Sequence, residues 1–169
     1  MTLFSDPTCQ FSHRVRIVLA EKGVTVEIEN TETDCVTDEI LEANPYGTLP
    51  TLVDRDLALY KSTVIMEYLD ERFPHPPLLP VYPVSRAESR LWIYRIERDW
   101  CSLIPKIEVQ DSDEARTELR DSIVSIASIF DEMPYFMSEE FTLVDCCLAP
   151  LLWRLPSYSI SLPKDRQTK

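Results

Sequence analysis

Glycine is almost absent from this chain, with Gly23 and Gly47 the only two among 169 residues. A loop that cradles phosphates needs several closely spaced glycines, so the sequence excludes both a P-loop and a dinucleotide-binding fingerprint. Histidine is equally scarce, and the five cysteines form no Cys-x-x-Cys pair. A structural zinc site is therefore not expected, nor is any other bound metal.

Long apolar runs are also missing. No apolar segment approaches the roughly 18 residues that a membrane span requires. Met1 leads directly into Thr2, Leu3 and Phe4, without the regions of a signal peptide. Five cysteines, an odd number, favour reduced thiols over a disulfide framework. We therefore expect a cytoplasmic protein that does not act on membranes.

Positive charge is in the minority. The formal net charge is -12, while 44% of the residues are hydrophobic, as in ordinary globular proteins. An acidic chain repels phosphate backbones, so we expect no direct binding of nucleic acid. A basic protein surface is the more compatible partner.

The first 72 residues alternate between short strand patterns and helical patterns. In chain order the sequence predicts a strand at Thr2–Ser5, a helix ending at Gly23, a strand at Val24–Ile28, a helix at Asp38–Ala43, strands at Thr51–Val53 and Leu57–Tyr60, and a helix capped by Ser62. This βαβαββα order is that of a thioredoxin-like domain. We therefore predict an α/β domain over residues 1–72.

The loop between the second helix and the third strand carries the most specific turn chemistry. Asn44-Pro45 and Gly47 favour a turn, and Leu49-Pro50 then leads into the strand. Because proline cannot donate to the strand ladder, Pro50 must lie at an edge or a turn. These residues alone fit either an ordinary trans proline or a cis-proline that presents backbone groups to a peptide-like ligand. The thioredoxin-like order predicts the cis form.

Prolines then mark a boundary, because five of the thirteen lie between Phe73 and Pro83. No helix or central strand tolerates that density, so we predict a stiff, exposed connector over residues 73–83. Beyond it the apolar period is helical throughout. One long helix is expected through Leu91–Leu103, another through Leu119–Phe130, and a third from a capping box that starts at Thr142.

These patterns predict an all-helical domain over residues 84–169, with a disordered polar tail at Lys164–Lys169. The three tryptophans, Trp92, Trp100 and Trp153, are expected in its core. The predicted fold class is thus α/β plus all-α.

The Pro50 loop, Lys61-Ser62 with the helix that follows, and the capping box at Thr142 resemble the glutathione transferase superfamily. Within it, three segments resemble the stringent starvation protein A family: Ser12–Gly23, Met66–Leu78 and Leu143–Pro156. The resemblance implies a bacterial transcription regulator that binds RNA polymerase holoenzyme, is usually a homodimer, and is not known for transferase activity. The family usually continues through two further helices after Pro156, where only thirteen residues follow here. We expect the helix that starts at Thr142 to be partly uncovered as a result.

The resemblance also assigns a vestigial glutathione site. Ser62 matches the serine that binds the γ-glutamyl carboxylate, and Leu49, which precedes Pro50, matches the residue whose backbone pairs with the cysteinyl part. Lys61 stands where relatives carry an acidic residue or glutamine for the ligand's ammonium group. Two like charges about 4 Å apart near a surface cost roughly 1–4 kcal/mol. We therefore expect weak or no glutathione binding and no cofactor, and Ser62 would serve mainly as a helix cap.

An enzymatic alternative depends on Cys9, which starts the pattern Cys9-Gln10-Phe11-Ser12. A thiol at a helix N-terminus is stabilised as the thiolate. Cys9 and Ser12 could therefore serve a glutathione-dependent transferase or thiol reductase, or Cys9 could be a cysteine without a role. The basic residues Arg14, Arg16 and Lys22 are interpreted as a solvated face of the same helix.

The partner-binding surface is expected at Phe73, Pro74, His75 and Pro76, together with Tyr82. Prolines pre-organise this segment, so binding a partner orders little additional backbone. The alternative is a rigid hinge between the two domains. The family resemblance favours the docking surface.

Overall fold

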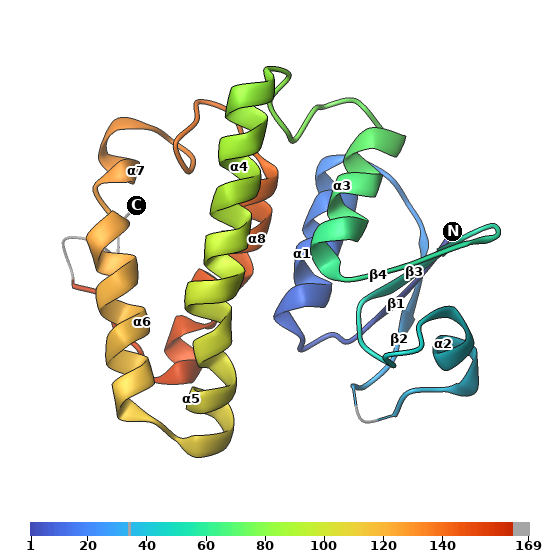
Figure 1. Ribbon diagram of the computed structural model, residues 1–169, viewed down its shortest axis with the longest axis horizontal. Coiled ribbons are helices and arrows are strands. Elements are labelled where there is room, and N and C mark those ends of the chain that lie inside the picture. The colour runs from blue at the N-terminus through green and yellow to red at the C-terminus, as the bar shows by residue number, and fades with distance from the viewer. Residues whose placement is uncertain (34, 164–169) are drawn as a thin grey trace. The chain divides into compact units, whose positions relative to one another are not determined.

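The computed structural model describes residues 1–33 and 35–163. The tail Lys164–Lys169, for which the sequence predicts disorder, lies outside the described residues. The chain divides into two compact units, Met1–Leu78 and Leu79–Lys169. Figure 1 shows a sheet with helices in the first unit and a set of helices in the second. The predicted α/β plus all-α fold class is confirmed.

Four short strands form the sheet of the first unit, in the order β2-β1-β3-β4. β1 (Thr2–Ser5) is parallel to β2 (Glu27–Asn30) and antiparallel to β3 (Thr51–Asp54), which is antiparallel to β4 (Leu57–Tyr60). The helices of this unit are α1 (Gln10–Glu21), α2 (Asp38–Ala43) and α3 (Ser62–Arg72). The predicted βαβαββα order is confirmed, although β2 begins at Glu27 rather than at Val24.

The two faces of this sheet are filled by different helices. Successive residues of a strand point to opposite faces, and Leu3 and Phe4 are both buried. Phe4 packs in a cluster with Ile40 of α2 and Leu49. The helices α1 and α3 pack against each other and bury apolar side chains at helical spacing: Val15, Val18 and Leu19 from α1, and Ile65, Met66 and Leu69 from α3.

The second unit consists of helices and the turns and loops that join them. Its elements are α4 (Pro83–Arg95), a wide π-type turn (Ile96–Trp100), a 3-10 turn (Cys101–Leu103), α5 (Ile104–Gln110), α6 (Asp113–Ile126), α7 (Ile129–Glu132), α8 (Leu143–Arg154) and a final 3-10 turn (Leu155–Tyr158). The long helix predicted through Leu91–Leu103 is helical throughout, but its winding changes after Arg95 from α to π and then to 3-10. Pro105 has no N–H to donate to the Cys101 carbonyl, and the helix changes its winding in the turn before this proline.

The capping box at the start of α8 is confirmed. The Thr142 hydroxyl accepts from the Val144 amide at 3.2 Å, and the Asp145 carboxylate accepts from the Thr142 amide at 2.9 Å. Most of α8 is buried. Trp153, however, is 71% exposed, so its predicted place in the core is wrong.

The segment predicted as an exposed connector is exposed only in part. Pro74 to Pro77 are exposed, but Leu78 and Leu79 are 2% and 5% exposed. These two leucines are therefore buried residues and not part of an exposed connector. The connector also ends one residue earlier than predicted, since α4 begins at Pro83.

Candidate functional site

Strand register brings three of the predicted site segments to one end of the sheet. β1 and β3 are antiparallel with Phe4 opposite Thr51, so the end of β1 lies beside the start of β3. β4 ends at the same edge, because Thr51 is also opposite Tyr60. The loop that follows β1, which carries Cys9, therefore lies at the same end of the sheet as Pro50 and Ser62.

The Leu49–Pro50 peptide bond is cis, which confirms the prediction. A buried amide supports the loop before it: Asn44 Nδ2 donates to the Thr48 carbonyl at 2.8 Å and to Thr51 Oγ1 at 3.0 Å. Asn44 Oδ1 in turn accepts from the Tyr46 amide at 3.0 Å. The Asn-Pro pattern predicted the turn here, but not that the buried Asn44 side chain would bridge its two ends.

Ser62 does not cap its helix in the predicted way. Lys61 occupies the cap position, with φ +74°, and Ser62 is the first helical residue. Ser62 is 2% exposed, and its hydroxyl has no hydrogen-bond partner among the described residues. A buried hydroxyl without a partner is costly, and here it lies among the unsatisfied N–H groups of a helix N-terminus. These groups fit an anionic ligand such as the carboxylate that the glutathione resemblance implies.

Cys9 directly precedes α1 and is half-buried, as the enzymatic reading requires. Ser12 does not join it as a reactive partner. Its side chain is completely buried, and its hydroxyl accepts from the Asp6 amide at 3.2 Å. Ser12 therefore fixes the loop after β1, and the described contacts do not show Cys9 and Ser12 acting as a pair.

Asp6 organises the loop that carries Cys9. Its carboxylate accepts from the amide and hydroxyl of Thr8 at 2.7 Å and from the Cys9 amide at 3.2 Å. Its second oxygen accepts from the amide of Thr33 at 3.2 Å and from the hydroxyl at 2.6 Å. Burial alone would raise the pKa of Asp6, but the hydrogen bonds from Thr33, Thr8 and Cys9 lower the pKa to about 2. The sequence analysis missed this residue, although Asp-Pro-Thr is a turn signal.

The interpretation of α1 as carrying a solvated basic face is wrong. Arg14 and Lys22 are buried. Arg16 donates to the Asp6 carbonyl at 3.0 Å and to the Pro7 carbonyl at 3.1 Å. Their long side chains are therefore structural, and Lys22 is considered further below.

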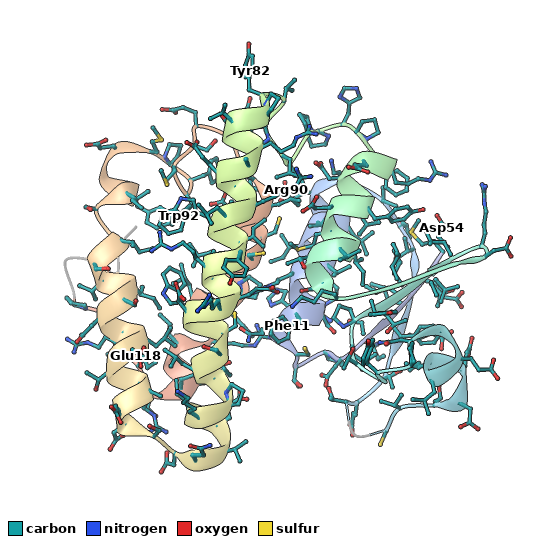
Figure 2. The ribbon with its side chains drawn as sticks, viewed as in Figure 1. Phe11, Asp54, Tyr82, Arg90, Trp92 and Glu118 are labelled. Atoms are coloured by element: carbon teal, nitrogen blue, oxygen red, sulfur yellow. The ribbon has the colours of Figure 1, made fainter. Side chains whose placement is uncertain are left out.

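The predicted partner-binding residues fall in both units. We call Phe73–Pro77 the proline loop; Phe73 is half-buried, with the Arg72 guanidinium 5.4 Å from its ring centroid, and the four residues after it are exposed. The His75–Pro76 bond is also cis. In the second unit, Tyr82 is 77% exposed and projects from the start of α4 (Figure 2), and its neighbours Val81 and Val84 are also exposed.

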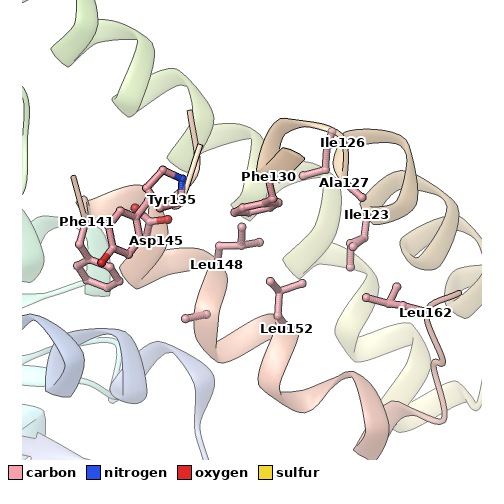
Figure 3. A pocket seen from close by; sticks show the side chains of 12 residues that line it. Ile123, Ile126, Ala127, Phe130, Tyr135, Phe141, Asp145, Leu148, Leu152 and Leu162 are labelled. Atoms are coloured by element: carbon pink, nitrogen blue, oxygen red, sulfur yellow. The ribbon is translucent and has the colours of Figure 1, made fainter. Parts of the chain in front are cut away.

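A groove in the second unit, between α6 and α8, was not predicted. It has a volume of about 270 Å³ and is lined mainly by apolar side chains, among them Ile123, Phe130, Leu148, Leu152 and Leu162 (Figure 3). The Asp145 carboxylate at its edge already accepts from the Phe136 amide and from the amide and hydroxyl of Thr142. The groove thus offers apolar surface and lacks the cluster of reactive groups that a catalytic site needs.

Family models match both units. The model described as glutathione S-transferase, N-terminal domain, matches residues 3–77, and that described as glutathione S-transferase, C-terminal domain, matches residues 91–168. Solved structures agree: an Omega 3C glutathione transferase from Trametes versicolor superposes with a TM-score of 0.83 at 24% identity, over 94% of this chain and 70% of that one. A Tau class enzyme from Mangifera indica gives 0.84 at 23% identity, over 99% and 82%. The chain has the glutathione transferase fold.

Relatives with higher sequence identity identify the family within the glutathione transferase superfamily. The chain is 59% identical over 163 residues to the stringent starvation protein A homologue of Pasteurella multocida, covering 95% of this chain and 77% of the relative. It is 55% identical to the homologue of Coxiella burnetii, covering 96% and 79%. This chain belongs to the stringent starvation protein A family of the glutathione transferase superfamily. Among its described residues, no helix has the length and apolar character that a membrane crossing demands.

Proposed function

We propose that this protein is a transcription regulator of the starvation response that associates with RNA polymerase holoenzyme and docks through the proline loop, with Tyr82 as a second contact. In this proposal it acts in the cytoplasm, as a homodimer, and works by binding rather than by group transfer. Membership of the stringent starvation protein A family supports the proposal. The observation that carries it is the exposed proline loop.

The chemistry of the proline loop suits a docking surface. Pro74, His75 and Pro76 are all exposed and adjacent, and exposed apolar patches of this kind mark interaction sites. The net charge of -12 adds an attraction to a basic partner surface that salt would weaken. Charge alone would not select one partner, so the specificity is assigned to the proline loop.

Lys61 disfavours the catalytic use of the fold. It stands directly before Ser62 at the N-terminus of α3, where relatives are expected to hold the ammonium group of glutathione. A second cation at this position repels that group. If glutathione does bind, Ser62 and the N–H groups of α3 would hold its carboxylate, and its thiol would supply the redox chemistry.

One specific observation supports a second candidate function, which is thiol transfer through Cys9. The cis-Pro50 loop, the unpartnered Ser62 hydroxyl and Cys9 all lie at the same end of the sheet. This is the arrangement expected of a site that could still accept a small peptide thiol. Thiol-transfer activity that is lost specifically in Cys9→Ser would favour this function over docking.

The docking proposal is tested by measuring the affinity of the full chain for purified RNA polymerase holoenzyme. We expect the triple variant Pro74→Ala, His75→Ala, Pro76→Ala to lose at least about a hundredfold in affinity, since a few central residues carry most of the energy of an interface. Its circular dichroism spectrum and melting temperature should stay close to those of the wild type, because these side chains are exposed.

The matched control is Pro45→Ala, Tyr46→Ala, which alters an exposed proline and an exposed aromatic residue on another loop of the same unit. We expect this variant to bind like the wild type. If the triple variant also keeps its affinity, the contact lies elsewhere. If the wild type itself does not bind the holoenzyme, the proposed function is wrong.

A further inference from the structure

A buried ion pair lies directly beneath the proline loop. Lys22, at the C-terminal end of α1, places its ammonium group 2.6 Å from Asp70 Oδ1 in the last turn of α3. The side chains of Lys22 and Asp70 are 0% and 9% exposed. A charge of either sign is expensive to bury without a partner, so each group depends on the other.

The same two side chains also bind the backbone of the loop. The Lys22 ammonium donates to the Pro76 carbonyl. Asp70 Oδ1 accepts from the Leu78 amide at 2.8 Å. The pair therefore binds the carbonyl of the residue before Pro77 and the amide of the residue after it. At this point the chain passes from the exposed proline loop to the buried Leu78.

Few other backbone bonds are available to fix this segment. Between Pro74 and Leu78, only His75 and Leu78 carry a backbone N–H, because the other three residues are prolines. Proline fixes φ but leaves ψ adjustable, so the loop needs contacts from outside itself to adopt a single shape. The contacts from Lys22 and Asp70 come from residues 54 and 8 positions away in the sequence.

We propose that Lys22 and Asp70 are positioning residues that set the shape in which the proline loop meets its partner. This inference rests on the proposed function, since it assigns a role in binding to a pair that is itself buried. A loop already held in its bound shape loses little conformational entropy on binding. Releasing it should therefore weaken association even though no contacting side chain has changed.

The decisive variant replaces both members of the pair, Lys22→Met with Asp70→Leu. Side chains of similar volume keep the site filled and leave no unpaired charge, so the fold is retained more readily than in either single variant. Neither new side chain can bind the Pro76 carbonyl or the Leu78 amide. We expect the affinity for RNA polymerase holoenzyme to fall at least about tenfold, and the Leu78 amide to exchange its hydrogen faster in the free protein.

Tyr68→Phe provides the matched control on the same helix. It removes a 2.6 Å hydrogen bond from the Tyr68 hydroxyl to Asp54, which ties α3 to the strand hairpin. Binding and Leu78 exchange should both stay at the wild-type values in this variant. An equal loss of binding in Tyr68→Phe would mean that any loosening of α3 has the same effect, and would overturn the inference.

The remaining outcomes separate this inference from the proposed function. If the wild type binds, the triple loop variant does not, and the Lys22→Met, Asp70→Leu variant binds normally, the inference is wrong and the proposed function stands. If the wild type does not bind, both are wrong. Should the double variant not fold, Asp70→Asn carries the test, because it keeps an oxygen for the Leu78 amide while removing the charge. Unchanged binding by a folded Asp70→Asn protein would overturn the inference.

Discussion

The buried polar groups at the two ends of α3 differ in their hydrogen bonding. At the N-terminal end, the Ser62 hydroxyl is buried without a hydrogen-bond partner among the described residues. At the C-terminal end, Asp70 is also buried, but it is bonded to Lys22 and to the Leu78 amide. An unpaired buried group suits a site that a ligand completes, whereas a fully engaged group suits a site that holds the protein's own backbone in place.

The two ends of α3 therefore correspond to two different functions: the N-terminal end to the ligand site of the glutathione transferase fold, and the C-terminal end to the proposed docking surface. Ser62, at the N-terminal end of α3, and the cis-Pro50 loop before β3 are elements of a ligand site, to which Lys61 adds a positive charge. The C-terminal end supports a loop with four exposed residues in succession. One helix thus connects a site where we expect Lys61 to weaken glutathione binding with the surface to which we assign docking.

The largest effect is expected from breaking the pair at the C-terminal end. Lys22→Met removes the ammonium group that lies 2.6 Å from the buried Asp70 carboxylate, so it should lower the free energy of unfolding by about 3–5 kcal/mol. Adding Asp70→Leu should recover at least half of this loss, since the buried carboxylate charge is then removed as well. Urea unfolding curves of the two variants measure the difference. A single variant as stable as the wild type would show that the pair does not hold this end of α3.

A smaller effect, on glutathione affinity, is expected when the positive charge at the N-terminal end of α3 is replaced by a negative one. Lys61→Glu restores an acidic group for the ammonium of glutathione, and should raise the affinity for glutathione by about tenfold or more, given the 1–4 kcal/mol estimated for the like charges. Isothermal titration calorimetry of both proteins measures this change. The control Lys61→Glu, Ser62→Ala should lose the gain. Micromolar binding by the unaltered chain would contradict the role given to Lys61.

The smallest effect, and one of opposite sign, is expected at Ser62 itself. Ser62→Ala removes a buried hydroxyl that has no partner, so it should raise the free energy of unfolding by about 1 kcal/mol. Thermal unfolding of the unliganded protein detects this increase. A decrease of similar size in the free energy of unfolding would indicate that the Ser62 hydroxyl forms a hydrogen bond in solution. The buried polar groups at both ends of α3 would then be bonded, contrary to the comparison drawn above.

The sequence predicted those features whose cause is local. Turn chemistry at Asn44-Pro45 predicted the turn before β3, and the spacing of Thr142 and Asp145 predicted the capping box. The cis form of Pro50 was predicted from the thioredoxin-like order of the elements rather than from the local residues. Proline density also indicated the exposed loop, because proline restricts the backbone wherever it occurs. The start of β2 was predicted too early, because the alternation of apolar and polar residues already begins at Val24, whereas the pairing with β1 begins only at Glu27.

Features that depend on distant partners could not be predicted. Lys22 appears in the sequence as one more cation on a basic helix, and its burial depends on Asp70, which lies 48 residues away. Ser62 has the residue type of a helix cap, but the positive φ of Lys61 moves the cap back by one position. In neither case does the residue type alone determine the role of the side chain.

The central claim, that the partner binds at the proline loop, is tested most directly by histidine footprinting. The chain contains two histidines, and only His75 lies in the proline loop, while His13 lies in α1. Modification by diethyl pyrocarbonate, read by mass spectrometry, therefore reports the loop and an internal control in one experiment. The account predicts that saturating RNA polymerase holoenzyme slows modification of His75 at least about tenfold and leaves His13 unchanged. Equal modification of His75 with and without bound polymerase would contradict the account.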